Sequence, residues 1–181
     1  MKKRITFIGS GEDRPGSPIY SLMQEAGRLV AEQGVVVVTG AYGGAMEAAV
    51  KGARQAEGGE VIAFALTSKP VCALLETREV RSWSNLPLEV QLGLRLGNLL
   101  LSGGFIMGAS GRIGTMVEFL SFVNLASKFW TDPKRLSILR AEEILPDVLQ
   151  FLLDSPLLAG IKYRIKITDN PAEAVVWVLS S

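Results

Sequence analysis

Short runs of apolar residues alternate with longer helical patterns along the whole chain, and glycine stands at many of the junctions. The run over residues 35–38 consists of four valines, and uninterrupted β-branched runs are typical of parallel strands that are covered on both faces. Strands that alternate with helices favour a parallel sheet wound on both sides. The sequence therefore predicts an α/β protein with one doubly wound, Rossmann-like, mostly parallel sheet and helices on both of its faces.

The same patterns give approximate bounds for each element. We expect strands at residues 4–8, 35–38, 60–66, 76–81, 104–109, 135–139 and 163–167, of which 76–81 is weak and suits a sheet edge. We expect helices at residues 18–33, 45–56, 86–101, 115–129, 142–153 and 171–179. The 181 residues show no internal repeat and no linker, so we expect a single nucleotide-binding domain over 1–181.

Composition excludes several classes of function. The chain has no histidine and one cysteine, which excludes disulfide frameworks, zinc sites built on Cys or His clusters, and nucleophilic systems that depend on histidine. A net charge of +1 argues against a nucleic-acid partner. No apolar stretch is long enough for a signal peptide or a bilayer span, so we expect a cytoplasmic protein without a membrane partner. No motif indicates a metal site or an organic cofactor.

Three glycine-bearing turns follow predicted strands, at residues 9–11, 40–44 and 110–114. In a parallel sheet such turns lie at one edge, where free backbone N–H groups and the positive ends of helices attract anions. None of the turns is a complete dinucleotide or Walker A motif, and each glycine has a purely steric alternative. We expect the turns to hold the phosphate of a nucleotide through the following residues: Gly9, Ser10, Gly40, Gly43, Gly44, Gly111, Arg112, Gly114 and Thr115.

Residues 110–118, Ser-Gly-Arg-Ile-Gly-Thr-Met-Val-Glu, carry the most specific pattern, together with Arg95 upstream. They resemble the signature of the Lonely Guy (LOG) family, also labelled "lysine decarboxylase-like", which reads Pro-Gly-Gly-x-Gly-Thr-x-x-Glu after an upstream arginine. Residues 40–47 are similar to the first glycine loop of that family. The resemblance covers residues 4–130, and the fold it implies is shared with molybdenum-cofactor carrier proteins and a DNA-processing protein.

The resemblance implies a phosphoribohydrolase that splits a nucleoside 5′-monophosphate into a free base and ribose 5-phosphate. It implies that Arg95 and Glu118 are the catalytic pair and that the glycines and Thr115 hold the phosphate. Cleavage of an N-glycosidic bond builds positive charge on the ribose, which a carboxylate such as Glu118 can stabilise. Ser110 stands where the signature has proline and Arg112 where it has glycine, and the arginine either obstructs a phosphate or contacts it.

Alternatives remain open. The same fold suits a non-catalytic nucleotide-binding or molybdenum-cofactor carrier protein, which Arg112 favours, and a DNA-handling role is a third, weaker hypothesis. Thr115 and Glu118 also fit a capping box, and Arg95 alone fits a solvated helix charge. Tyr42 suits either stacking on a base or covering its loop. Apolar residues cover wide faces of the helices over 86–101 and 115–129, which predicts a homodimer or higher homo-oligomer through them.

Overall fold

The computed structural model of the protein describes residues 2–76, 79–141 and 145–180. Within these residues a seven-stranded sheet has the order β4-β3-β2-β1-β5-β6-β7, and every pairing is parallel. Its strands are β1 (Arg4–Ile8), β2 (Val36–Thr39), β3 (Val61–Phe64), β4 (Val80–Arg81), β5 (Gly104–Gly108), β6 (Arg135–Leu139) and β7 (Ile165–Thr168). The predicted α/β class and parallel, doubly wound sheet are confirmed.

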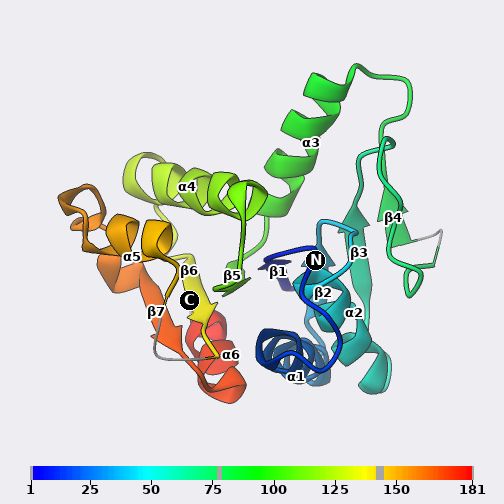
Figure 1. The fold of residues 1–181 in the computed structure, drawn as a ribbon, viewed down its shortest axis with the longest axis horizontal. Coiled ribbons are helices and arrows are strands. Elements are labelled where there is room, and N and C mark those ends of the chain that lie inside the picture. The colour runs from blue at the N-terminus through cyan, green and yellow to red at the C-terminus, as the bar shows by residue number, and fades with distance from the viewer. Residues whose placement is uncertain (1, 77–78, 142–144, 181) are drawn as a thin grey trace.

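Helices cover both faces of this sheet (Figure 1). One layer contains α1 (Pro18–Glu32), α2 (Ala45–Gln55) and α6 (Pro171–Leu179), with α1 packed between the other two. The opposite layer contains α3 (Leu88–Leu100), α4 (Ile113–Lys128) and α5 (Asp147–Asp154). Burial of the central strands explains why their sequences are continuously apolar: Ile5 and Phe7 of β1 are fully buried, and so is Val37 of β2.

The chain leaves β1 toward β2 on one side and leaves β5 toward β6 on the other, although β1 and β5 are neighbours. This reversal makes the gap between their carboxyl ends the switch point at which open α/β sheets bind ligands. The loops after β1, β2, β3 and β5 all reach this edge. The arrangement therefore gathers the three predicted glycine turns in one region of the molecule.

Several element bounds differ from the sequence-based expectation. The weak strand at 76–81 is reduced to β4 at the sheet edge, and residues 77–78 lie outside the described part. The helix expected from 142 begins at Asp147, after Pro146 as its N-cap, since a proline disfavours helical backbone at the residue before it; residues 142–144 are not described. The last strand begins at Ile165 because residues 162–164 form a 3₁₀ turn, η3 (Lys162–Arg164), which comes shortly after another such turn, η2 (Pro156–Leu158).

Candidate functional site

A cavity of about 490 Å³ opens at the carboxyl ends of the strands on the β2 and β3 side of the switch point. A pocket of this volume can hold a nucleotide-sized ligand. Its wall is built from the loops after β1, β2, β3 and β5, from the starts of α2 and α4, and from the middle of α3. The lining residues are Gly9, Ser10, Gly11, Glu12, Tyr42, Gly43, Met46, Leu66, Lys69, Pro70, Leu92, Arg95, Arg112, Gly114, Thr115 and Glu118.

Arg95 of α3 and Glu118 of α4 form a buried ion pair in the wall of this cavity. Arg95 Nη1 donates to Glu118 Oε1 at 2.9 Å, and the residues are 7% and 8% exposed. The other guanidinium donors bond to backbone carbonyls, with Nε 3.1 Å from Phe64 O and Nη2 3.5 Å from Gly40 O. Arg95 is therefore held by groups from three elements, and neither a solvated charge nor a capping box describes this pair.

Burial dominates the electrostatics of Glu118. It raises the pKa of the carboxyl above its usual range, although the charge and hydrogen bond of Arg95 act in the opposite direction. A carboxyl group whose pKa is shifted toward neutrality, inside a cavity and beside a permanent cation, has the properties of a proton-transfer group.

Gly40 makes room for the guanidinium. A Cβ atom at this position would lie 1.9 Å from Arg95 Nη2 and 3.0 Å from the Met46 sulfur. The glycine predicted to contact phosphate therefore has another role, because it lets Arg95 cross the end of β2. Gly40 itself does not line the cavity.

The start of α4 presents unpaired donors to the same cavity. The helix begins at Ile113, and Arg112, its N-cap residue, makes no side-chain capping bond. The N–H groups of the first turn have no partner within the helix, so Gly114 and Thr115 bring the positive end of the helix to the cavity wall. Gly111 lies behind them, where a Cβ would collide with the Thr115 side chain at 2.4 Å.

The two residues of this turn that differ from the signature, Ser110 and Arg112, each contact an acidic residue of the loop after β1. Arg112 pairs with Glu12 at 2.6 Å, with most of both side chains exposed. Ser110 donates to Asp13 at 2.7 Å. These two contacts join the β1–α1 loop to the β5–α4 turn, and the pairing with Glu12 holds the arginine at the cavity rim.

The loops after β1 and β2 are packed closely against one another. Gly44 has a φ of +67°, and a Cβ there would lie 2.2 Å from Ser10 O, while Ala45 N donates to the same oxygen at 2.9 Å. A Cβ on Gly9 would likewise lie 2.6 Å from the Ala45 Cβ. Gly9, Ser10 and Gly43 line the cavity, whereas Gly44 only shapes its wall.

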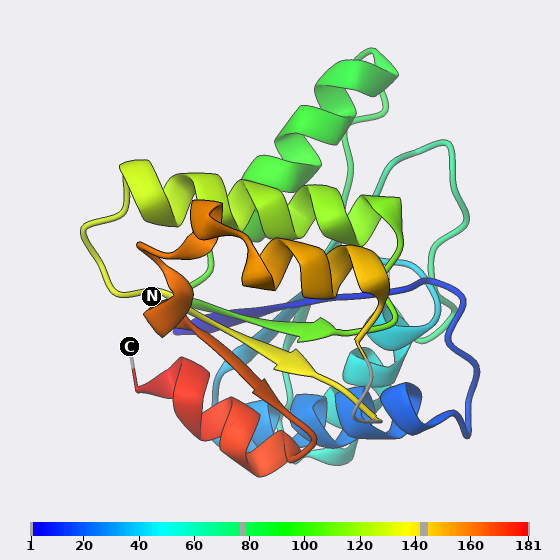
Figure 2. The same ribbon diagram turned by 60° about the vertical axis from the view of Figure 1, so that its left-hand side comes forward.

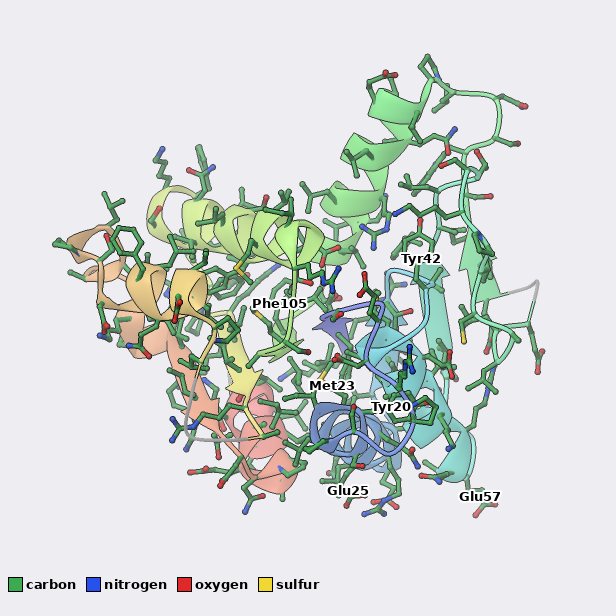
Figure 3. All side chains as sticks on the ribbon, in the orientation of Figure 1. Tyr20, Met23, Glu25, Tyr42, Glu57 and Phe105 are labelled. Carbon is green, nitrogen blue, oxygen red and sulfur yellow. The ribbon has the colours of Figure 1, made fainter. Side chains whose placement is uncertain are left out.

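Two further lining residues complete the site. The Tyr42 hydroxyl accepts a hydrogen bond from Leu66 N at 3.0 Å, and its ring lies 5.3 Å from the Arg95 guanidinium carbon and 5.6 Å from Lys69 Nζ (Figure 3). Lys69 is a lining residue that the sequence patterns did not indicate. Its position just after the predicted strand over 60–66 was the available signal, because the carboxyl ends of all strands meet at this edge.

Arg95 and Arg112 each have a carboxylate partner, whereas no carboxylate of the described residues pairs with Lys69. Within the same residues no cluster of histidine, cysteine, aspartate or glutamate has the arrangement of a metal site. The described helices also include none with the length and apolar character required to cross a membrane. The cavity thus combines a free cation, an open helix N-terminus and a buried carboxyl group.

Solved structures of the same fold include proteins whose names refer to a small molecule or to DNA. The protein TM1055 aligns over 100% of both chains with a TM-score of 0.70 and 22% identity. The molybdenum cofactor binding protein from Rippkaea orientalis aligns over 99% of this chain and 97% of its own, with a TM-score of 0.69 and 21% identity. DNA processing protein A from Helicobacter pylori, described with a single-stranded DNA binding mode, aligns over 98% and 80%, with a TM-score of 0.64 and 18% identity.

Sequence comparison places the chain in a narrower group of proteins than the shared fold does. An uncharacterized protein from Archaeoglobus fulgidus is 39% identical over 69 residues, which is 38% of this chain and less than half (44%) of that relative. The family model described as "SLOG cluster4 family" matches residues 2–128, a range that contains β1 to α4 and every residue that lines the cavity. On this match the chain belongs to the SLOG cluster4 family.

Proposed function

We propose that the cavity binds a nucleoside 5′-monophosphate and hydrolyses its N-glycosidic bond, which is the activity implied by the LOG-like signature. The observation that carries the proposal is the buried Arg95–Glu118 pair, 2.9 Å apart, beside the open N-terminus of α4. A phosphate at the first turn of α4 accepts the N–H groups near Gly114 and Thr115 and is favoured by the helix dipole. The sugar of such a ligand then extends toward Glu118, one helical turn further along α4.

The hydrolysis needs a group that accepts a proton from the attacking water and a negative charge near C1′, and Glu118 can supply both. As the bond between C1′ and the base nitrogen breaks, positive charge develops on the ribose, and the Glu118 carboxylate stabilises it. The same carboxylate accepts a proton from the water that attacks C1′. The departing base leaves with the bonding electrons and takes its proton from solvent, and Glu118 then returns the proton it gained to solvent. Arg95 orients the carboxylate, and its charge opposes the loss of ionisation that burial favours.

The decisive variant is Glu118→Gln, which keeps the size and one hydrogen-bond acceptor of the side chain. We expect it to lower the release of free base from AMP, GMP, IMP and CMP by at least about a hundredfold, the usual contribution of a general base. Affinity for the monophosphate should stay within a few fold. Chromatographic detection of free base measures the first quantity and calorimetry the second.

Glu57→Gln, in the turn that follows α2 (Figure 3), serves as the matched control and should keep full activity. Base release by Glu118→Gln at the wild-type rate would refute the assignment of this residue. Binding of monophosphates without release of base, across the whole panel, would refute the hydrolase.

A second candidate is a non-catalytic carrier of a phosphate-bearing small molecule. Arg112 favours it, since a side chain 71% exposed at the N-cap of α4 leaves a cation at the rim for a ligand larger than a monophosphate. The shared fold with molybdenum cofactor carrier proteins is compatible with it. Mass spectrometry of small molecules released from the purified protein tests it: a bound pterin supports the carrier, and a bound monophosphate from which no base is released supports a non-catalytic nucleotide-binding protein.

A further inference from the structure

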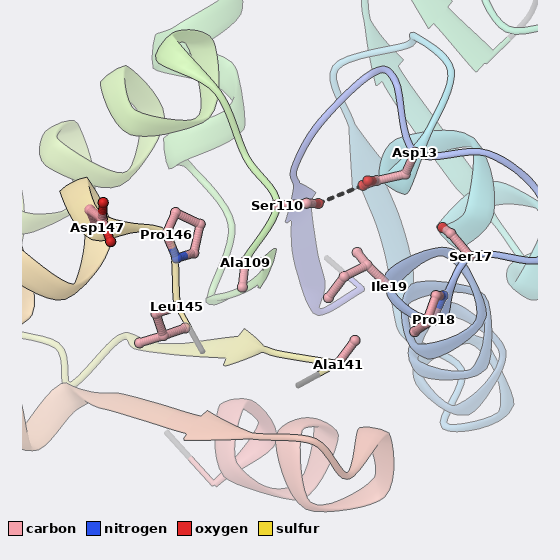
Figure 4. Close-up of a pocket in the computed structure, with 10 residues that line it drawn as sticks. All are labelled: Asp13, Ser17, Pro18, Ile19, Ala109, Ser110, Ala141, Leu145, Pro146 and Asp147. Atoms are coloured by element: carbon pink, nitrogen blue, oxygen red, sulfur yellow. Dashed lines mark hydrogen bonds between the residues drawn. The ribbon is translucent and has the colours of Figure 1, made fainter. Parts of the chain in front are cut away.

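A second cavity, of about 530 Å³, lies on the other side of the loop contacts at the switch point (Figure 4). It opens at the carboxyl ends of β1, β5 and β6, between the start of α1 and the start of α5. Its lining residues are Asp13, Ser17, Pro18, Ile19, Ala109, Ser110, Ala141, Leu145, Pro146 and Asp147. None of them is Arg95 or Glu118, so this cavity is separate from the proposed nucleotide site.

The charge of this lining is opposite to what a phosphate needs. Asp13 and Asp147 contribute carboxylates, and no lysine or arginine is among the described residues that line the cavity. The two helix starts at the cavity also carry their own acceptors. Ser17 accepts the N–H of Tyr20 in the first turn of α1, and Asp147 is the acidic residue in the first turn of α5. The cavity therefore favours a neutral or cationic ligand that donates hydrogen bonds.

Asp13 is the hydrogen-bond acceptor in this cavity whose orientation is already fixed. Ser110 Oγ donates to its Oδ2 at 2.7 Å and fixes the carboxylate, and among the described residues no group donates to Oδ1 (Figure 4). Burial raises the pKa of Asp13, Ser110 opposes that shift, and the charge of Glu12 adds to it. No described cation pairs with this carboxylate. A ligand that donates hydrogen bonds to it would therefore stabilise its negative charge, which the described residues leave without a cation.

The rest of the wall is apolar. Ile19 and Leu145 are buried, and Pro146 and two alanines complete the surface. Such a wall suits the faces of a planar ring, while a carboxylate at its edge suits two adjacent N–H donors of that ring, which bind a carboxylate bidentately.

We propose that this second cavity binds a planar heterocycle with a cyclic guanidine edge, of the kind that guanine carries, through the carboxylate of Asp13. The ring lies between the start of α1 and the segment at Leu145–Pro146, and its N–H edge faces Asp13. Recognition here involves neither a phosphate nor the Arg95–Glu118 pair. The inference thus stands independently of the hydrolase.

Guanosine is the probe, because it carries the guanidine edge and has no phosphate. We expect calorimetry on the full chain to detect guanosine binding, and we expect inosine, which lacks only the 2-amino group, to bind at least about tenfold more weakly. Asp13→Asn keeps an acceptor for Ser110 but removes the charge, and it should weaken guanosine binding by at least about tenfold. Ala141→Trp fills the cavity from the end of β6 and should abolish guanosine binding.

Ribose 5-phosphate tests the other cavity in the same samples. Its affinity for both variants should remain within about twofold of the wild-type value, and their melting temperatures report intact folding. Equal affinity for inosine and guanosine, or guanosine binding that survives Ala141→Trp, would overturn the proposal. So would guanosine binding that is lost in Glu118→Gln and kept in Asp13→Asn, since the nucleoside would then occupy the Arg95 cavity. Failure to bind ribose 5-phosphate would count against the hydrolase alone.

Discussion

The Arg95–Glu118 pair is costly to bury, because both charges leave water. The structure offsets this cost with a short contact between the two groups and with two backbone carbonyls that accept the remaining guanidinium donors. Removal of one partner would leave the other charged, buried and unpaired. We therefore attribute this buried ion pair in the cavity wall to chemistry on a bound ligand rather than to the stability of the fold.

The titration of Glu118 follows from this environment. Because burial raises its pKa above the ordinary glutamate value of about 4.3, the carboxylate form needed for hydrolysis should be lost as the pH falls, at a pH above that ordinary value. We expect a ¹³C NMR titration of the side-chain carboxyl to show this midpoint, with Glu118→Gln identifying the resonance. A midpoint at or below the ordinary value would mean that Arg95 outweighs burial.

At the residue scale the sequence predicts the catalytic candidates and misses their surroundings. Arg95 and Glu118 are recognisable because they match the LOG-like signature: Arg95 comes one helix and one strand before the glycine turn, and Glu118 follows that turn in α4. The acidic partners of Arg112 and Ser110 lie about a hundred residues away in the chain, so no local pattern reveals them. Ala41 also escapes prediction, because its φ of 72° is imposed by the packed loop around it.

At the element scale the closest packing is between α1 and α2. A Cβ on Gly52 would lie 1.8 Å from Gln24 O, and one on Gly27 would lie 2.3 Å from Ala49 O. The two helices therefore meet backbone to backbone, which holds the start of α2 and the loop after β2 against β1. Glycines within helical patterns gave no such indication in the sequence, since glycine in a helix is locally unfavourable and only a tertiary contact explains it.

This contact predicts a large effect of a small substitution. Gly52→Ala should destabilise the protein by about 1–3 kcal/mol, because the added methyl group must separate two helix backbones. Gly160→Ala is the matched control, since a Cβ there meets no atom within 4 Å, and it should change stability by less than about 0.5 kcal/mol. Urea unfolding of both variants measures the difference, and equal stability of the two would show that the helices separate freely.

Across the whole molecule, the alternation of strands and helices was sufficient to predict the parallel sheet and the edge at which the site lies. The irregular parts could not be predicted in the same way. Pro146 and the turn over residues 162–164 set the bounds of α5 and β7, and these depend on packing rather than on periodicity. The cavities themselves arise where loops from distant parts of the chain meet, so their shape was beyond any local pattern.

Helix α3 extends beyond the rest of the molecule (Figure 2), and many apolar side chains of α3 and α4 are exposed. The exposed apolar side chains of these two helices are Leu88, Val90, Leu92, Leu94, Ile113, Val117 and Leu120. This number of exposed leucine, isoleucine and valine side chains on one layer favours contact with another protein surface. We therefore expect a homodimer through α3 and α4, as the sequence pattern of both helices also predicts.

Leu120→Arg should break this dimer, because it places a charge in the apolar contact, whereas Val176→Arg on α6 of the opposite layer should leave the assembly intact. Light scattering coupled to size-exclusion chromatography measures the mass of each protein at micromolar concentration. Leu92 belongs to the exposed surface and also lines the cavity of Arg95, so the monomeric variant should bind ribose 5-phosphate more weakly than the dimer. A monomeric wild-type protein would contradict the dimer, and unchanged affinity in a monomeric Leu120→Arg would show that the cavity is complete within one chain.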